Sequence, residues 1–310
     1  MFFAFTETGF QPVEPEEIDE TGLTAGYVSV EELDSLCGRL GFDKSSVRAC
    51  RNAEGFFRSG VEAHRDYTFT ELRILNADEG EDDRIALFLR RNLILVVDIA
   101  DWDGSTKAKY LAVLEQDPAG AVCCEKLLSA FLGQLLAGDH KVMETMENLL
   151  SEKEEELLES EIDREFNADL LRLKKLLSKR HTYYAQLLDV VDAVGENANG
   201  IFEEERLFYL DNTAKKIQRL YEDTGSLRSS VEHLQDAYSS YLDIKLNNTM
   251  KLFTVLTSIF FPLTIIVGWY GMNFQSMPEF TWKYGYLYVI ALSIVTVWVL
   301  ISIGRRKKWF

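Results

Sequence analysis

The chain has 310 residues, with 33 lysines and arginines against 50 aspartates and glutamates, which gives a net charge of −17. Nucleic acid is therefore not an expected partner, because its phosphate backbone attracts basic surfaces. Hydrophobic residues make up 47% of the chain, enough for a sizeable core in one large or two ordinary domains. The four cysteines match no zinc-site spacing, and we interpret them as free, buried thiols in a reducing compartment.

Residues 1–117 are predicted to form an α/β domain. The segments 67–75, 84–91 and 92–101 have the alternating or β-branched apolar patterns of strands, and we expect them in one sheet with the last strand buried. A helix is predicted between Ser29, a suitable N-cap, and Gly41. The first ten residues, MFFAFTETGF, lack the basic region of a signal peptide, so this domain is expected in the cytosol.

Residues 118–200 lose the strand pattern and are predicted to be an acidic helical region. One helix is expected to end near Gly138, and a second to run from about His140 to Val194. Eight acidic residues fall between positions 152 and 165, on a segment that keeps an apolar helical stripe. A solvated amphipathic helix is one interpretation of this segment, and a surface that collects cations is the other.

Residues 201–250 are predicted to be a long stalk helix that continues into the apolar segment after it. Apolar residues recur every seven positions in two phases, which begin at Leu210 and Leu220. After Gly200 the sequence contains no helix breaker except Gly225 until Pro262, so one helix is expected from about Glu203 to Trp269. A single helix of this length would be on the order of 100 Å long.

Two segments have the length and composition of transmembrane helices. The first, 251–270, contains 19 consecutive residues without Asp, Glu, Lys or Arg, and the second, 284–304, contains a run at least as long. Each would span the roughly 30 Å hydrocarbon core of a bilayer. The tail 305–310 is basic, so the positive-inside rule places both termini in the cytosol and the loop 271–283 outside.

A second, polar stripe lies on the stalk helix, about 200° from the apolar one. It consists of Asp236, Asp243, Met250, Thr257, Thr264 and Gly271, interleaved with Ser240, Asn247, Thr254, Phe261 and Gly268. Small residues of this kind also line tight helix contacts in membranes, but the carboxylates in the cytosolic half favour a cation pathway. Because two spans cannot enclose a channel, several copies would have to surround it.

The stretch YGMNF, followed closely by MPEF at the end of the first span, resembles the signature of the CorA family of magnesium channels. The resemblance extends to the basic tail and, in outline, to the long helix and the acidic helices before it. It implies a funnel-shaped homopentamer in a prokaryotic inner membrane, with the first spans lining the pore and with membrane lipid and divalent ions as partners. Gly271, Met272 and Asn273 would form an outer mouth that binds Mg²⁺ with its waters retained.

The resemblance also implies roles for the rest of the polar stripe. Thr264 would present a ring of hydroxyls, and Phe261 and Met250 would form apolar constrictions that gate by dewetting. Phe261 stands where the family pattern has a methionine, which leaves the width of the pore open. The other residues implied to line the pore are Thr257, Thr254, Asn247, Asp243 and Asp236.

Cytosolic Mg²⁺ is implied to be a regulatory ligand as well as the transported ion. Asp211, near the start of the stalk helix, is a candidate ligand for it, or else an ordinary solvated acid. Glu279, in the outer loop, either concentrates cations or is simply solvated.

Two alternatives remain open at this point. The chain could transport another divalent cation, such as Co²⁺, Ni²⁺ or Zn²⁺, on the same scaffold. It could instead be a membrane-tethered oligomeric scaffold, although this would not explain the polar stripe. Enzymatic activity is not expected, since the histidines at 64, 140, 181 and 233 are scattered and no nucleophile motif or phosphate-binding loop is present.

Overall fold

The computed structural model describes residues 1–6, 9–17, 22–51, 60–76, 82–116, 122–159, 162, 165–272 and 282–306. The chain forms two compact units, an N-terminal unit, Met1–His233, and a C-terminal unit, Leu234–Phe310. Helix α7, Phe208–Tyr270, contributes residues to both units.

A seven-stranded mixed sheet forms the centre of the N-terminal unit. Its strands are β1 (Phe2–Thr6), β2 (Gly9–Val13), β3 (Thr24–Ser29), β4 (Val61–Ala63), β5 (Thr68–Ile74), β6 (Asp83–Arg90) and β7 (Leu93–Ala100). They lie in the order β2-β1-β3-β7-β6-β5-β4, in which β3 and β7 pair in parallel and the other neighbours pair antiparallel. The α/β class is confirmed, and the three predicted strands are β5, β6 and β7.

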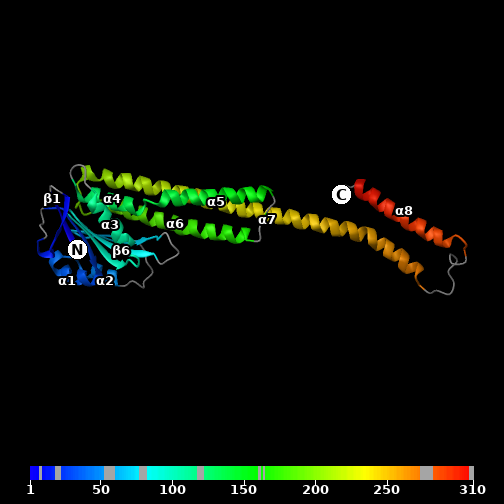
Figure 1. The fold of residues 1–310 in the computed structure, drawn as a ribbon, viewed down its shortest axis with the longest axis horizontal. Helices are drawn as coiled ribbons and strands as arrows, with labels where there is room; N and C mark the ends of the chain where they lie inside the picture. Colours follow the sequence, from blue (N-terminus) through cyan, green and yellow to red (C-terminus); the bar gives the residue numbers. More distant parts are fainter. Residues whose placement is uncertain are drawn as a thin grey trace. The chain divides into compact units, whose positions relative to one another are not determined.

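Helices cover both faces of this sheet because its central strands are apolar on both sides. The helices of this unit are α1 (Val30–Leu40), α2 (Lys44–Arg51), α3 (Ser105–Glu115), α4 (Cys124–Leu135), α5 (Asp139–Glu159), α6 (Phe166–Gly195) and the first part of α7, with short 3₁₀ turns η1 (Pro15–Glu17) and η2 (Glu204–Arg206). Leu95 of β7 belongs to the buried cluster with α1 and α2, whereas its neighbour Val96 points to the opposite face. There Tyr110 of α3 donates from its hydroxyl to the Ile94 carbonyl (3.3 Å). The result is a three-layer α/β/α arrangement (Figure 1).

The predicted helix between Ser29 and Gly41 is confirmed as α1, and its ends show why the sequence identified it. The Glu32 N–H donates to the Ser29 hydroxyl, and the Glu32 carboxylate accepts from the Ser29 N–H, which forms a capping box. At the other end Gly41 has a φ of 68°, the left-handed conformation that favours glycine.

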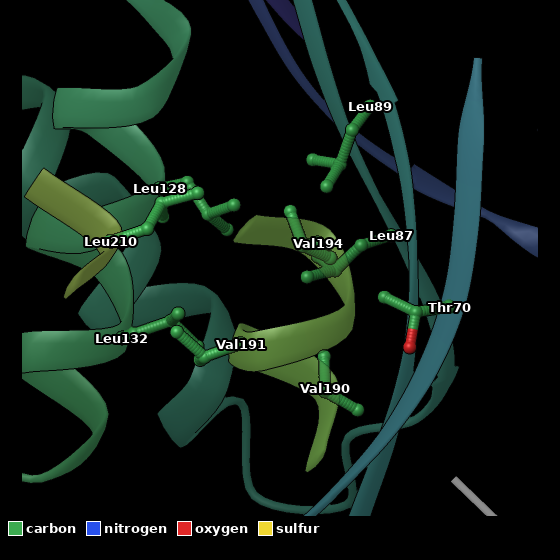
Figure 2. A pocket seen from close by; sticks show the side chains of 9 residues that line it. All are labelled: Thr70, Leu87, Leu89, Leu128, Leu132, Val190, Val191, Val194 and Leu210. Carbon is green, nitrogen blue, oxygen red and sulfur yellow. The ribbon is translucent and has the colours of Figure 1, made fainter. Parts of the chain in front are cut away.

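A small apolar cavity of about 10 Å³ lies between the sheet and the helices. Figure 2 shows the residues that line it: Thr70, Leu87, Leu89, Leu128, Leu132, Val190, Val191, Val194 and Leu210. Thr70 is the polar member, and its buried hydroxyl finds no hydrogen-bond partner among the described residues. A buried polar group left unpaired costs about 1–3 kcal/mol, so Thr70 lowers the stability of this core.

Helices α5 and α6 form an antiparallel hairpin, so the prediction of one helix from His140 to Val194 is wrong. Helix α5 ends at Glu159 and α6 begins at Phe166. Lys153 Nζ lies 3.3 Å from Asp169 Oδ2, although the same residues in one straight helix would be roughly 24 Å apart. The sequence between the helices contains neither Gly nor Pro, and it therefore lacks the usual signal for a reversal.

Asn199 connects the α6–α7 segment to the sheet. Its Nδ2 donates to three acceptors of the β4–β5 hairpin: the His64 carbonyl (2.8 Å), the Tyr67 carbonyl (3.1 Å) and the Thr68 hydroxyl (3.0 Å). Close to it, the Asn197 side chain donates to the Phe202 carbonyl and accepts from the Phe202 N–H. The connection before α7 is thus hydrogen-bonded on both sides.

The start of α7 is also fixed to α4. The Glu203 N–H donates to Glu125 Oε1 (3.1 Å), and the hydroxyls of Ser129 and Thr213 lie 2.7 Å apart. The seven-residue apolar pattern is buried in this first part of α7, at Leu210, Ile217, Thr224 and Val231. The first part of α7 therefore packs against other helices of the N-terminal unit.

An aspartate and three of the cysteines are among the buried polar residues of this unit. The side chain of Asp82 is only 3% exposed and pairs with Arg73 Nη2 (2.6 Å) and Lys179 Nζ (2.7 Å). The four cysteines are free, and three are buried as predicted, whereas Cys37 is partly exposed. Burial raises the pKa of Cys50 to about 12, so this thiol stays protonated and unreactive near neutral pH.

The C-terminal unit contains the second part of α7 and α8, Gly285–Arg306. Both helices are long and apolar enough to cross a membrane, and almost none of either apolar stretch is buried within the chain. They agree in number and place with the two predicted transmembrane segments.

Candidate functional site

The polar stripe occupies one face of α7. The helix is unbroken from Phe208 to Tyr270, and residues seven positions apart on a helix differ by only about 20° in direction. The candidate residues on this face are all exposed: Asp236, Asp243, Asn247, Met250, Thr254, Thr257, Phe261 and Thr264. The structure thus brings the candidate pore-lining residues of α7 together on a surface that the chain itself leaves uncovered.

The threonines of this face direct their hydroxyl hydrogens back to their own helix. Thr254, Thr257 and Thr264 donate to the carbonyls four residues earlier, at 2.8, 2.7 and 2.9 Å. A hydroxyl has one hydrogen and two acceptor lone pairs, so each oxygen can still accept a hydrogen bond. Water bound to a cation points its hydrogens outward, and acceptors of this kind therefore suit a hydrated cation.

Two large apolar side chains interrupt the polar face. Met250 and Phe261 are 56% and 64% exposed, and they lie about 16 Å apart along the helix axis. Pro262 follows Phe261 inside the helix and lacks the N–H that would bond the Ser258 carbonyl. Proline is tolerated in membrane helices when other groups satisfy the freed carbonyl.

Gly271 and Met272 directly follow Tyr270, the last residue of α7. The Gly271 N–H donates to the Val267 carbonyl (2.9 Å), and a Cβ at position 271 would lie 2.9 Å from the same oxygen, too close for a side chain without a shift of the backbone. Glycine therefore allows the helix to end tightly at this point. Met272 is exposed, while Asn273 and Glu279 lie outside the described residues.

Asp211 lies in the first turn of α7 and has a counterion. Its carboxylate is 2.6 Å from Lys215 Nζ, and both side chains are largely exposed. Asp211 also lines a surface groove together with Asp192 and Glu196. Burial, followed by repulsion from neighbouring acids that include Asp211, raises the pKa of Asp192. The structure places Asp211 near other carboxylates but already pairs it with a lysine.

A second group of carboxylates was missed by the sequence analysis. Asp83 at the start of β6 and Asp101 and Asp103 after β7 each have an oxygen within 4.8 Å of the others. Burial raises the pKa of Asp83, with smaller contributions from the two other acids, while hydrogen bonds from Asn76 and Thr106 oppose the increase. The only sequence signal was the acidic segment ADWDG directly after a buried strand.

His64 lies between a serine and an aspartate at distances like those of a Ser-His-Asp triad, but it belongs to a structural cluster. Its Nε2 lies 3.2 Å from Ser46 Oγ, and its Nδ1 lies 3.4 Å from Asp43 Oδ2. Ser46 is completely buried and also contacts the Tyr67 hydroxyl (3.0 Å). Because no substrate can reach Ser46, the cluster serves to join α2 to the β4–β5 hairpin.

Two apolar helices, a polar face that continues along one of them and an acidic α/β unit together define a metal-ion transporter of the membrane. The family model described as "CorA-like Mg2+ transporter protein" matches residues 26–306. The chain belongs to this CorA family of magnesium transporters.

Two relatives named as CorA transport proteins are similar over most of the chain, and a third is similar over about a third of it. The cobalt/magnesium transport protein CorA of Thermotoga maritima is 26% identical over 256 residues, which cover 81% of this chain and 73% of the relative. The protein of the same name from Methanocaldococcus jannaschii is 26% identical over 290 residues, 90% of this chain and 88% of the relative. The magnesium transport protein CorA of Haemophilus influenzae is 38% identical over 95 residues, 31% of this chain and 30% of the relative.

Solved structures show the same fold. The CorA magnesium transporter of Methanocaldococcus jannaschii has a TM-score of 0.80 at 21% sequence identity and covers 100% of this chain and 99% of its own. The full-length CmaX protein has a TM-score of 0.76 at 17% identity and covers 99% and 97% of the two chains. The whole architecture, from the sheet to the second apolar helix, is therefore that of solved full-length proteins.

Proposed function

We propose that this chain is the subunit of a magnesium channel in which several copies, five by the family resemblance, place the polar face of α7 around a central pathway. The observation that carries the proposal is the continuity of that face, which runs on one exposed, unbroken helix from Asp236 through the apolar span. Polar groups within a bilayer face protein or water and avoid lipid. Since the part of the chain that the structure describes contains two such helices, other copies would be needed to enclose the polar face.

The chemistry of this face suits hydrated Mg²⁺. Mg²⁺ dehydrates reluctantly and usually keeps several of its waters. Rings of Thr264 hydroxyls, and of Asn273 amides at a mouth formed with Gly271 and Met272, would accept hydrogen bonds from those waters. Recognition would then depend on the size and geometry of the hydrated ion.

Two features would control passage further along the helix. Phe261 and Met250 would narrow the pathway and close it by excluding water. Asn247, Asp243 and Asp236 would line a cytosolic neck, where carboxylates raise the local concentration of cations.

In this proposal the N-terminal unit and both termini lie in the cytosol. The channel would carry Mg²⁺ into the cell across a prokaryotic plasma membrane. Residues 234–310 carry seven basic and three acidic residues, a net charge of +4, so residues 1–233 carry −17 − 4 = −21. Mg²⁺ that binds between such acidic units would reduce their repulsion and favour a closed state. Asp211 is a candidate for this regulation, and Glu279 is a candidate for concentrating cations outside.

The test is Mg²⁺ uptake into proteoliposomes that contain an Mg²⁺-sensitive dye. Asn273→Ala should lower uptake by about tenfold or more, since each lost hydrogen bond to the ion's waters contributes on the order of 1 kcal/mol. Thr264→Val should lower uptake by a smaller factor, because it removes one acceptor per subunit from the pathway.

Thr296→Val is the matched control for Thr264→Val. Thr296 lies in α8, and its hydroxyl donates to the Leu292 carbonyl (2.8 Å) as Thr264 does to that of Phe260 (2.9 Å). Equal losses in the two variants would contradict a pathway along α7. Absence of uptake by the unmodified chain at low internal Mg²⁺ would contradict the channel and favour the membrane-tethered scaffold.

Co²⁺ is the second candidate ion. The relatives from Thermotoga maritima and Methanocaldococcus jannaschii are both named cobalt/magnesium transport proteins. A pathway that recognises the hydrated ion would admit Co²⁺, and competition between Co²⁺ and Mg²⁺ in the uptake assay measures the preference.

A further inference from the structure

The face of α7 opposite the polar stripe has a different chemistry where the helix enters its apolar span. Tyr241, Lys245 and Leu252 lie about 160–200° around the helix from Asp243. A shallow surface groove on this side is lined by Tyr241, Ile244, Lys245, Asn248, Thr249 and Leu252. The groove thus combines a cation, an amide and apolar side chains on one face of one helix.

The charge of Lys245 is not neutralised by its helix. On a helix, partners lie three or four positions away, and positions 241, 242, 248 and 249 contain no acid. Instead, Lys245 Nζ lies 5.8 Å from the ring centroid of Tyr241, which holds the ammonium over an aromatic face. Lys215, farther back on the same helix, differs because it pairs with Asp211. The charge of Lys245 is therefore available to an anion from outside the helix.

The position of Lys245 along α7 matches the head-group layer of a bilayer. Lys245 lies seven residues before Leu252, where the uncharged span begins, which is about 10 Å along the axis. Lipid head groups occupy roughly the 5–8 Å beyond the hydrocarbon core on each side, and a lysine can extend its ammonium toward that layer. The exposed Arg305 and Arg306 end α8 at the same side of the membrane, since the chain crosses twice.

The donors of the groove can be identified from its hydrogen bonds. The Thr249 hydroxyl donates its hydrogen to the Lys245 carbonyl (2.9 Å), so it has none left for an anion. Lys245 Nζ, the Asn248 amide and the Tyr241 hydroxyl remain as donors, and Leu252 provides an apolar surface one to two turns deeper. This combination fits a ligand that is anionic at one end and apolar at the other.

We propose that this groove binds an anionic phospholipid of the cytosolic leaflet, with its phosphate at Lys245 and Asn248 and an acyl chain along Leu252. This inference rests on the proposed function, because the groove faces the lipid only if the polar stripe on the opposite side of α7 faces the pathway. Basic residues beside a membrane span attract anionic lipid with about 1 kcal/mol per charge.

Native mass spectrometry of the full-length protein tests the site. The protein is exchanged into detergent with equal amounts of phosphatidylglycerol and phosphatidylcholine, and the bound lipid is counted. Lys245→Gln should weaken the retention of phosphatidylglycerol about fivefold, whereas Lys215→Gln on the same helix should leave it unchanged. Lys245→Arg should restore most of it, which shows that charge rather than packing is measured.

Several results would overturn the proposal. Equal retention of the two lipids, or no loss in Lys245→Gln, excludes a charge-selective site at this groove. A loss that occurs in Arg305→Gln with Arg306→Gln but not in Lys245→Gln places the lipid at the end of α8 instead. Displacement of the lipid by inorganic phosphate at equal concentration indicates a site for a soluble phosphate.

Mg²⁺ uptake by the same preparations separates this inference from the proposed function. A chain that transports no Mg²⁺ but loses phosphatidylglycerol on Lys245→Gln contradicts the channel and supports the lipid site. A chain that transports Mg²⁺ and binds no phosphatidylglycerol contradicts the lipid site alone.

Discussion

The two units of this chain differ in where their side chains find partners. In the N-terminal unit, contacts connect distant segments, as Lys179 does with Asp82 (2.7 Å) and Arg180 with Asp139 (3.0 Å). In the described part of the C-terminal unit, side-chain hydrogen bonds such as those of Thr254 and Thr296 return to the same helix. The first unit is stabilised by contacts within its own chain, whereas the apolar stretches of the second are almost entirely unburied among the described residues.

Helix α7 shows this difference within one element. Val231 is completely buried, whereas Leu256 is 42% exposed and Phe260 61%. The apolar repeat is similar in both parts, so the pattern alone does not tell which surface an apolar residue meets. The neighbouring residues in the sequence do, because the charged Arg228 and Glu232 lie within one turn of Val231, whereas no charged residue lies between Leu252 and Tyr270.

The largest expected effect contrasts a phenylalanine from each unit. Phe88 is completely buried, with the rings of Phe42 and Phe69 at centroid distances of 4.5 and 4.9 Å. Phe88→Ala should lower the free energy of unfolding of the N-terminal unit by about 3–5 kcal/mol. Phe260→Ala should leave that transition within about 0.5 kcal/mol. Urea unfolding in detergent, followed by circular dichroism, measures both changes. Equal effects would contradict the claim that only the N-terminal unit is stabilised by contacts within the chain.

A smaller effect is expected at the buried carboxylate Asp82. Asp82→Asn leaves Arg73 and Lys179 without their shared counterion, and it should cost about 2 kcal/mol, less than a fully buried pair because both cations are half exposed. The control is Glu16→Gln, which removes an exposed partner of Arg39 (3.8 Å) and should cost at most about 0.5 kcal/mol. Denaturation midpoints compare the two variants. Similar losses would show that burial of Asp82 does not increase the contribution of its ion pairs to stability.

The smallest effect is a gain in stability. Thr70→Val keeps the shape of the side chain and removes the unpaired hydroxyl beside the apolar cavity of Figure 2. The variant should be more stable by about 1 kcal/mol. Thr68→Val on the same strand is the control, since its hydroxyl accepts from Asn199 and its loss should destabilise the unit. A loss of stability in Thr70→Val would show that the hydroxyl is satisfied.

The sequence predicted the elements whose local signals agree with their place in the fold. Strands β5 to β7 alternate or are β-branched, and α1 has both of its caps. The hairpin of β1 and β2 was missed because Pro12 argues against a strand, although β2 is an edge strand where proline is tolerated. The reversal between α5 and α6 was missed because it depends on tertiary contacts such as Lys153 with Asp169.

The same distinction applies to the candidate site. The polar face of α7 could be predicted because its residues share one helix, on which spacing determines direction. The group of Asp83, Asp101 and Asp103 could not, because pairing of β6 with β7 brings it together. The roles of Asn273 and Glu279 follow from the family resemblance and remain predictions.

The Asn199 amide has a mechanical consequence for the long helix. Its two hydrogens are shared among three acceptors of the β4–β5 hairpin, and α4 holds the next residues through Glu125 and Ser129. The segment before α7 is therefore held to the sheet on one side and to α4 on the other. A displacement of the β4–β5 hairpin would have to break these hydrogen bonds or be transmitted to the first turns of α7.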